Sequence, residues 1–596
     1  MADLLTALPP GVLLVIAAVL VPLLPRRWGP VVGVGIPALV VVWIAVVPAG
    51  AHLPARLFGF DVLLFRVDPL SRTVGLIQAF VAAAAAAYAY CTGASRRAIG
   101  LSLAYLAAGL GVVFAGDWLT LLLWWEALAI AATALVWATG DGAAARAGLR
   151  YAVYHELGGI ALVAAVLLHF VETGTFLFGG AGATGVTGAI EATTGLAAGL
   201  PALLGAIGIG LNVGFVGLHP WLVDTYPRPH VATSVVLAAV TTKVGVYALA
   251  RAFPDGSVPL AYVGGAMLLV GVTYAILQTG VRRLLTYHIV SQVGIMVAGI
   301  GIGSPLGLAG AFAHLVNNVL YKSLLFMIGG LLILRVGRSN LKKLGGLARP
   351  MPVAFGAYLV AAMAIAGVPG FNGFVSKSMV FDAAETAGFD LLWWVLVVGS
   401  VGTVISFVKF GYYAFFHGEH GEEIEAAAGN EVEDANRLET LALVAIAVPC
   451  VVFGLVPALQ FAVLPGATDA AKPFAASQFV KAGGILGAGA VAFVVLKTPL
   501  GRIGGVPDLD SVYHPAGARV MRIVARVVGE SGAGIDASVK RITTAAIRVA
   551  EDPASLVPDH LDDRLDVVDS HREDAIGASV LLLVLAVALF LLVSYV

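Results

Sequence analysis

The stretch GAFAHLVNNVLYKSLLF, residues 310–326, places polar side chains inside a long apolar run. His314, Asn318 and Lys322 are spaced by four residues, so on a helix they share one face at intervals of about 6 Å. Within a membrane such a stripe is costly and is usually kept for function. A single buried histidine is more often a satisfied core residue than part of a relay. Because histidine and lysine share one face here, we interpret the stripe as a proton relay in a membrane-spanning helix.

Three further lysines, Lys243, Lys377 and Lys409, lie in apolar runs, whereas the arginines gather at the ends of such runs. Desolvation can remove the proton from a lysine but effectively not from an arginine, so buried lysines indicate proton handling. Lys377 follows a helix break and marks an exit toward one surface, unless its side chain simply extends to the interface. Lys409 lies near the end of a span and is expected to extend in that way.

The composition is that of a membrane protein: 59% of the 596 residues are hydrophobic and 12% are charged. We predict an all-α, polytopic membrane protein with about 16 transmembrane helices, within a range of about 14 to 16. A net charge of −1 without a basic patch argues against nucleic acid as a partner, and the two cysteines cannot form an iron–sulfur or zinc cluster. The predicted spans lie near residues 11–24, 31–48, 69–91, 99–115, 118–138, 151–171, 200–219, 231–253, 259–278, 286–303, 306–334, 353–382, 391–416, 438–463, 481–497 and 576–596.

Basic residues follow the odd-numbered spans, as at Arg96-Arg97 and Arg282-Arg283, so these connectors are predicted to face the cytoplasm. Both termini are then predicted to lie on the outer side of the cell (cytoplasmic) membrane. The first apolar segment is interpreted as a membrane helix and not as a cleaved signal, because Asp3 precedes it and Arg26-Arg27 follow it.

Helix breakers interrupt two predicted spans, in GLHPWLVDTYPRPH (217–230) and AGVPGFNGFVSK (366–377). Backbone groups freed at membrane depth need protein or a water-filled cavity as a partner, so paired breaks indicate a conduction route. For the first segment a surface turn is the alternative, because Asp224 and Arg228 suit an interface. For the second, the apolar flanks favour a true break.

Glu126 lies nine residues after Asp117, which places it about 13 Å along the predicted span. A structural carboxylate paired with a neighbouring helix is as common at such a position as a transport role. Lys243 favours the transport role, because a buried acid and a buried base can couple their protonation.

Further candidate residues are His155-Glu156 in YAVYHELGG and His288 with Gln292 in TYHIVSQVG. The first pair lacks the second histidine of the zinc motif HExxH, so a structural or relay role fits better. The glycine-rich strings at 205–214 and 299–304 lie in apolar spans with no strand before them, where small residues serve helix packing. We therefore expect no cofactor and no metal.

Several motifs occur in order along residues 60–415: WWEALA (124–129), TTKVGVYALAR (241–251), TYHIVSQVGIM (286–296), GSPLGLAGAFAHL (303–315), YKSLLFMIGG (321–330), LKKLGGL (341–347) and GFVSK (373–377). Together they resemble the D-type subunit of Mrp-type cation/proton antiporters, whose wider family includes the antiporter-like proton-translocating subunits of complex I. The last 180 residues match less clearly.

This resemblance implies two inverted five-helix repeats with broken helices, at 99–255 and 256–418, after N-terminal transmembrane helices at 1–98. C-terminal transmembrane helices are expected at 419–500 and a final one at 576–596. Between them, residues 501–575 interleave basic and apolar residues at helical spacing, which predicts amphipathic interfacial or lateral helices.

The resemblance also implies site residues. The proton relay would consist of Glu126, Lys243, His314, Lys322 and Lys377, with His155, Glu156, His219, His288, Asn212 and Asn318 as accessory positions. Asn212 stands where the family usually has a lysine, seven residues before His219, and Asn318 where a histidine commonly precedes the relay lysine by four. Asparagine takes up no proton at working pH, so the partner of Glu126 would be Lys243, His219 or the His155-Glu156 pair.

Three functions follow as hypotheses. In the favoured one, the chain is a transporter subunit and not an enzyme: one membrane subunit of a hetero-oligomeric sodium(cation)/proton antiporter that conducts protons within the lipid bilayer. In the second, it is a proton-translocating membrane-arm subunit of a respiratory NADH:quinone oxidoreductase-like or hydrogenase complex, with the redox sites in other subunits. In the third, suggested by Asn212, it is a scaffold or energises the uptake of another solute.

Overall fold

The computed structural model describes residues 6–25, 27–178, 194–418, 432–466 and 468–503, together with 506 and 511. Twelve of the helices in these residues are long and apolar enough to cross a membrane, and three more apolar helices are shorter. Together they match fifteen of the predicted spans. The sixteenth, at 576–596, and most of the segment predicted to form interfacial helices at 501–575 lie outside the described residues.

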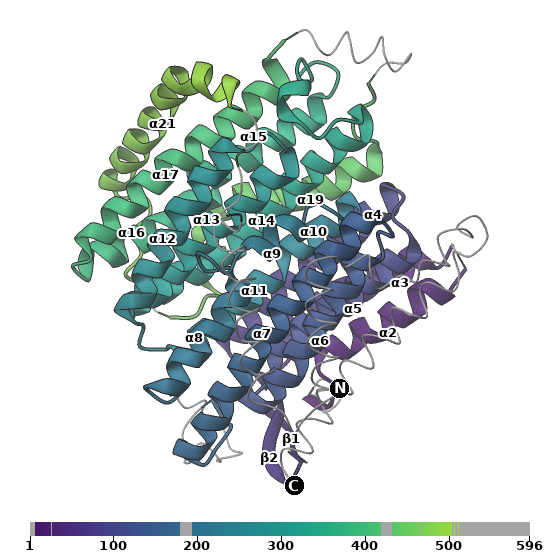
Figure 1. Ribbon diagram of the computed structural model, residues 1–596, viewed down its shortest axis with the longest axis vertical. Coiled ribbons are helices and arrows are strands. Elements are labelled where there is room, and N and C mark those ends of the chain that lie inside the picture. The colour runs from purple at the N-terminus through teal and green to yellow at the C-terminus, as the bar shows by residue number, and fades with distance from the viewer. Residues whose placement is uncertain are drawn as a thin grey trace, which may run out of the picture. The chain divides into compact units, whose positions relative to one another are not determined.

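The N-terminal part pairs helices with a β hairpin that was not predicted from the sequence. Its strands are antiparallel, and the two-residue turn between them, Phe58-Gly59, has positive φ at both positions, the conformation that continues strand twist into a tight hairpin. Figure 1 shows the strands at one end of the helices. The elements are α2 (Pro10–Leu23), α3 (Gly29–Val46), β1 (Gly50–Leu57), β2 (Phe60–Val67) and α4 (Pro69–Cys91).

Two successive groups of helices share one order: three continuous helices, one broken helix and a fifth helix. The first group consists of α5 (Arg96–Phe114), α6 (Trp118–Trp137), α7 (Gly142–Thr173), the broken helix α8 (Leu200–Val213) and α9 (Pro220–Thr225), then α10 (Val231–Ala239) with α11 (Thr241–Ala252). The second consists of α12 (Val258–Leu277), α13 (Val281–Gly301), α14 (Pro305–Val336), the broken helix α15 (Pro352–Ala366) and α16 (Asn372–Thr386), then α17 (Asp390–Gly411).

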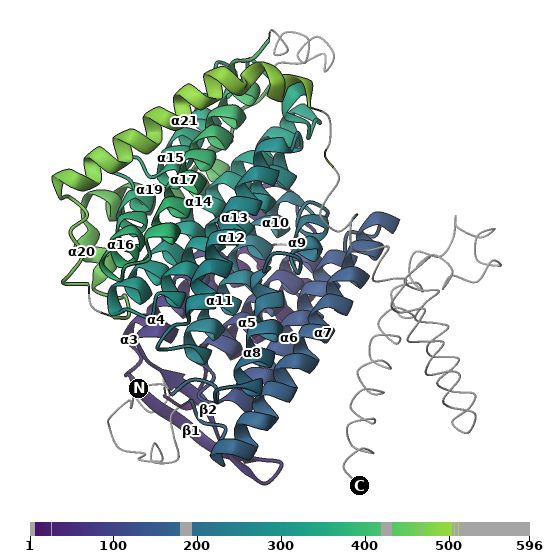
Figure 2. The same ribbon diagram turned by 60° about the vertical axis from the view of Figure 1, so that its left-hand side comes forward.

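The remaining elements are shorter or more peripheral. A 3₁₀ turn spans Leu341–Lys343, and a π-helix, Tyr412–Phe416, ends α17. They are followed by α19 (Arg437–Leu455), α20 (Pro457–Phe461) and α21 (Ala476–Arg502). Figure 2 shows α21 along the edge of the bundle, where it packs on α17.

Both predicted helix breaks are confirmed. α8 ends at Gly214 and α15 at Gly367, two glycines in the left-handed conformation that terminates helices. The first break is not a surface turn, because His219 and Trp221 beside it are completely buried. A third interruption, at Val240 between α10 and α11, was not predicted. No glycine or proline marks it in the surrounding sequence VLAAVTTKV, residues 236–244.

Glycines let helices approach closely, as expected for the two glycine-rich strings. A Cβ at Gly208 would lie 2.6 Å from the Gly158 carbonyl oxygen, and one at Gly299 would lie 2.8 Å from the Gly307 carbonyl oxygen. Helix association in membranes depends on such close packing of small residues. The strings therefore serve packing of α8 on α7 and of α13 on α14.

Replacing Gly373 with alanine is expected to destabilise the second broken helix. The new Cβ would lie 1.9 Å from the Ala364 carbonyl oxygen, so α15 and α16 must move apart. Overpacking of this kind costs about 1–3 kcal/mol. The measurement is the midpoint of thermal unfolding of purified protein in detergent. Gly356→Ala in α15, where a Cβ meets no atom within 4 Å, is the control and should leave the midpoint unchanged or slightly raised. Equal midpoints for both variants would contradict this account.

Candidate functional site: a buried polar path

The polar stripe of α14 lies in the interior. In Figure 1 this helix lies among α10, α13 and α19, and it also contacts α4, α15 and α16. His314, Asn318 and Lys322 have no exposed surface. The predicted shared face is therefore buried within protein and does not face lipid.

A hydrogen-bonded group forms around Tyr321. His314 Nε2 lies 3.3 Å from the Tyr321 hydroxyl, which also accepts a hydrogen bond from Asn318 Nδ2 (3.2 Å) and donates one to Gln292 Oε1 (3.4 Å). His314 Nδ1 lies 3.0 Å from the Ser376 hydroxyl on α16. Tyr321 and Ser376 were missed from the sequence, although each directly precedes a candidate lysine.

Lys322 points toward α13 and α17. Its Nζ donates to the Leu285 carbonyl oxygen at 3.0 Å and lies 5.7 Å from the centre of the Phe407 ring. The His288 ring packs on the same phenylalanine, with 4.7 Å between ring centres. Both ring nitrogens of His288 are buried without a hydrogen-bond partner among the described residues. Phe407 thus contacts both titratable groups.

Two of the other lysines lie at helix interruptions. Lys377 Nζ donates to the Ile365 carbonyl oxygen (2.7 Å) in the last turn of α15, and Lys243 Nζ donates to the Ala238 carbonyl oxygen (2.8 Å) in the last turn of α10. Carbonyls in the last turn of a helix have no donor within that helix. Each interruption therefore supplies its lysine with a neutral acceptor in place of a carboxylate.

Lys409 departs from the expectation that it extends to the interface. Its side chain is 2% exposed, and Nζ donates to the carbonyl oxygens of Ile276 and Gln278, both at 2.6 Å. The end of α12 lies close enough to α17 to hold the ammonium group inside, so proximity to the end of a span did not place the group at the surface.

Glu126 is half-buried on α6 and faces α7. A Cβ on Gly159 would lie 2.4 Å from its Oε1, and the charge that acts on it is that of Glu156, one turn earlier on α7. Among the described residues no ion pair joins Glu126 to Lys243. The Glu126 carboxylate therefore lies against the helix that carries His155-Glu156, one of its three predicted partners.

Three other predicted positions of the first five-helix group are buried, whereas Glu156 is half-buried. Asn212 is 1% exposed, and its Oδ1 has no partner within the described part of the chain. The His219 ring packs against Tyr287 with 6.2 Å between centres. His155 is 1% exposed and stacks on Tyr151.

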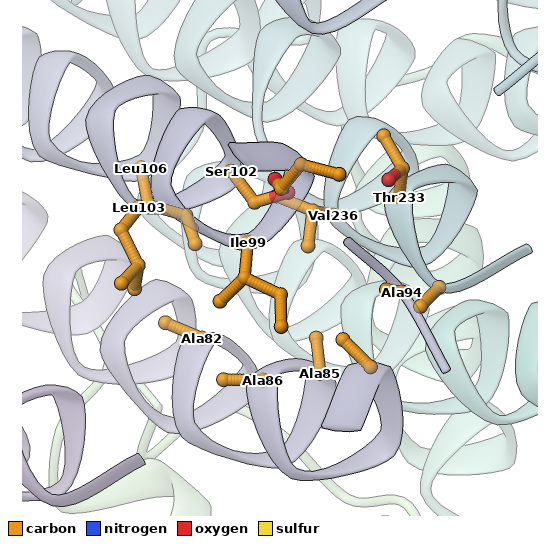
Figure 3. Close-up of a pocket in the computed structure, with 13 residues that line it drawn as sticks. Ala82, Ala85, Ala86, Ala94, Ile99, Ser102, Leu103, Leu106, Thr233 and Val236 are labelled. Atoms are coloured by element: carbon orange, nitrogen blue, oxygen red, sulfur yellow. The ribbon is translucent and has the colours of Figure 1, made fainter. Parts of the chain in front are cut away.

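We call the buried polar residues described above the polar path. A cavity between α4, α5 and α10 lies outside it (Figure 3). Its lining is rich in alanine, with Ser102 and Thr233 as its polar side chains, and its volume is about 10 Å³, barely the space of one water molecule. In the described ranges no three histidine, cysteine or carboxylate side chains are grouped so as to hold a metal.

Comparison with known proteins assigns the family. Residues 115–406 match the family described as NADH:quinone oxidoreductase/Mrp antiporter, TM. The N-type NADH-quinone oxidoreductase subunit of Desulforudis audaxviator is 31% identical over 370 residues, covering 58% of this chain and 71% of the relative. The D-type Na(+)/H(+) antiporter subunit of Alkalihalophilus pseudofirmus is 30% identical over 315 residues, covering 51% of this chain and 63% of the relative, so the chain spans less than two thirds of that protein.

A solved structure supports the same fold. An archaeal respiratory membrane complex, the membrane-bound sulfane sulfur reductase, contains a chain with a TM-score of 0.69 and 22% identity, covering 97% of this chain and 99% of that one. The buried polar helices, the two broken helices and these similarities agree. The chain is a multi-pass membrane protein that belongs to the NADH:quinone oxidoreductase/Mrp antiporter transmembrane family.

Proposed function

We propose that this chain is the proton-conducting membrane subunit of a multi-subunit sodium(cation)/proton antiporter in the cell membrane. The observation that carries the proposal is the arrangement of Lys243, Lys322 and Lys377, each fully or almost fully buried and each donating to a backbone carbonyl instead of a carboxylate. An amine without a paired anion can release its proton without leaving an uncompensated charge. Permanently ion-paired lysines would suit a purely structural role better.

In this proposal the residue roles are those implied by the resemblance. Glu126 and Lys243 serve the first half, and His314, Lys322 and Lys377 serve the second. The two five-helix groups act as inverted repeats with boundaries near 99–255 and 256–418, and both termini lie outside. Other subunits of the complex carry the cation in this proposal. Partner subunits are supported by the name of the antiporter relative, which is itself one subunit of a Na(+)/H(+) antiporter.

The test is transport by the assembled complex. Everted membrane vesicles from cells that express this chain with its partner subunits are energised to an acid interior, and sodium chloride is added. Sodium-dependent alkalinisation of the interior, followed with a pH-sensitive dye and absent without this chain, is the expected result. Vesicles in which neither sodium nor another monovalent cation moves protons would contradict the antiporter assignment.

Exchanging Glu126 for glutamine is expected to lower this flux about 10-fold or more, because the amide keeps the size of the side chain but cannot exchange a proton. Glu172→Gln is the control, since Glu172 is an exposed carboxylate at the end of α7. Flux unchanged by Glu126→Gln would remove that residue from the relay.

A second candidate function is a membrane-arm subunit of a redox-driven complex. It is favoured by the likeness to the NADH-quinone oxidoreductase relative and by the fold shared with a respiratory complex over 97% of the chain. Purifying the assembled complex separates the two functions. Copurified subunits with iron–sulfur or flavin absorbance would support the redox-driven complex, and their absence from an active complex would support the antiporter.

A further inference from the structure

The first half of the path has a gap between its acid and its base. Glu126 faces Gly159 and Glu156 on α7, while Lys243 lies on α11 and donates to Ala238. α7 contacts α6, α8 and α9, so side chains of α7 are placed to connect these helices. Two of them, Tyr151 and His155, are buried and polar.

Tyr151 joins α7 to the interruption before Lys243. Its hydroxyl lies 3.0 Å from Thr241 Oγ1, and Thr241 is the first residue of α11. Tyr105 on α5 lies 2.5 Å from the same threonine oxygen and accepts a hydrogen bond from the Thr241 amide at 2.8 Å. Three hydroxyl groups therefore meet two residues before Lys243, at a point with no solvent exposure.

His155 lies one turn after Tyr151 on α7 and one turn before Gly159, the residue that faces Glu126. Its ring stacks on Tyr151 with 3.7 Å between centres and meets Trp221 edge-on at 4.4 Å. Nδ1 lies 2.8 Å from the Tyr151 carbonyl oxygen, which can only accept, so Nδ1 carries the hydrogen and Nε2 of the neutral ring is the basic atom. Nε2 is buried without a partner among the described residues. His155 Nε2 is thus a buried atom that can accept a proton.

Asn212 cannot supply this function. It lies next to Leu211, whose carbonyl accepts a hydrogen bond from Trp221 Nε1 at 3.0 Å, so the indole lies between His155 and this part of α8. The Asn212 amide binds no proton at working pH, and its Oδ1 is also buried without a partner in the described structure. Along α7, His155 lies one turn from Gly159, which faces Glu126, and one turn from Tyr151, which reaches Thr241.

We propose that His155 is a proton carrier in the first half of the path, and that Tyr151 and Thr241 are positioning residues for the transfer to Lys243. A proton leaves the carboxyl group of Glu126 or Glu156, which becomes a carboxylate, and binds His155 Nε2 to form the imidazolium. The imidazolium then passes a proton to the neutral amine of Lys243, through water ordered by the hydroxyl groups of Tyr151 and Thr241, and becomes a neutral imidazole again. This inference rests on the proposed proton transport.

The test uses the vesicle assay on the assembled complex. His155→Gln keeps a side-chain donor for the Tyr151 carbonyl but cannot carry a proton, and it should lower the flux about 10-fold or more. Asn212→Lys introduces an amine in the same half. The double variant His155→Gln/Asn212→Lys is expected to recover most of the flux, which a merely structural defect at position 155 would not allow.

A second variant covers the case in which His155→Gln does not assemble. Tyr151→Phe keeps the ring stacked on His155 and removes only the hydroxyl, so it should lower the flux without changing the amount of complex. Wild-type flux in His155→Gln, a loss that the double variant fails to recover, or wild-type flux in Tyr151→Phe would each overturn the inference. Lys322→Ala, measured in parallel, separates a failure of the proposed function from a failure of this inference. If Lys322→Ala and His155→Gln both have wild-type flux, the proposed function fails. If Lys322→Ala abolishes flux and His155→Gln does not lower it, only this inference fails.

Discussion

Replacing Lys322 with alanine is expected to abolish sodium-dependent proton flux, with a loss of about 100-fold. Its ammonium group is fully buried beside Leu285 and Phe407, and it lies on the same face of α14 as His314. Removing the amine removes a group that can accept and release a proton in the middle of the bundle. Flux is measured in vesicles, and the amount of assembled complex is measured by copurification of the other subunits.

Lys322→Arg distinguishes proton transfer from charge. An arginine keeps a positive charge in the same place but does not release its proton at any working pH, so this variant should also be inactive. Lys343→Ala is the control, because Lys343 is exposed in the connector after α14. Flux retained in Lys322→Arg would mean that a fixed charge suffices, and Lys322 would not be a relay residue.

Asp68→Asn is expected to cause the largest loss of stability. The Asp68 carboxylate at the start of α4 is 3% exposed and pairs with Arg251 at 2.5 Å and with Arg66 at 3.1 Å, while Oδ1 accepts the Ser71 amide and caps the helix. Breaking a buried ion pair leaves the partner charge buried and uncompensated, at a cost of about 3–5 kcal/mol. A lower midpoint of thermal unfolding in detergent is the measurement.

The matched control lies in β2, the strand that ends just before Asp68. Asp61 pairs with Arg56 at 3.0 Å, but their side chains are 86% and 74% exposed, so Asp61→Asn should leave the midpoint unchanged within error. Similar midpoints for the Asp68 and Asp61 variants would contradict a structural role for the buried cluster.

The same cluster determines how stability responds to acid. Burial alone would raise the pKa of the Asp68 carboxyl, but the charges of Arg251 and Arg66 outweigh burial and hold that pKa below its usual value. Because the folded-state pKa is lower than that of the unfolded chain, about 3.9, the contribution is complete above that pH. It is lost as the pH falls through the lower folded-state value. The wild-type protein should therefore lose this contribution only below about pH 4, and Asp68→Asn should lack it at neutral pH.

Much of the architecture followed from local patterns. Apolar runs predicted twelve helices of spanning length and three shorter apolar helices in the described residues, and glycine with proline predicted the breaks after α8 and α15. The spacing of His314, Asn318 and Lys322 predicted their shared buried face. These features were accessible because helix periodicity, helix termination and the cost of a polar group in lipid act within a few residues.

Other features depended on contacts between distant segments. The β hairpin at 50–67 turns at Phe58-Gly59, which is not a common turn pair, and Asp117, which lies far along the chain, accepts the Leu63 amide. The interruption at Val240 carries no helix breaker and is held by Tyr105 from another helix. The side chain that Glu126 faces was also decided by tertiary packing, because α7 lies against the carboxylate.

The sequence by itself therefore determined that the chain crosses a membrane many times and buries titratable amines, because hydrophobic length and the cost of charge are properties of each segment alone. Only the tertiary structure decided which acceptor each amine meets. Backbone carbonyls, and not carboxylates, receive Lys243, Lys322 and Lys377, because the helix interruptions and the packing of α13 against α14 bring those oxygens within hydrogen-bonding distance.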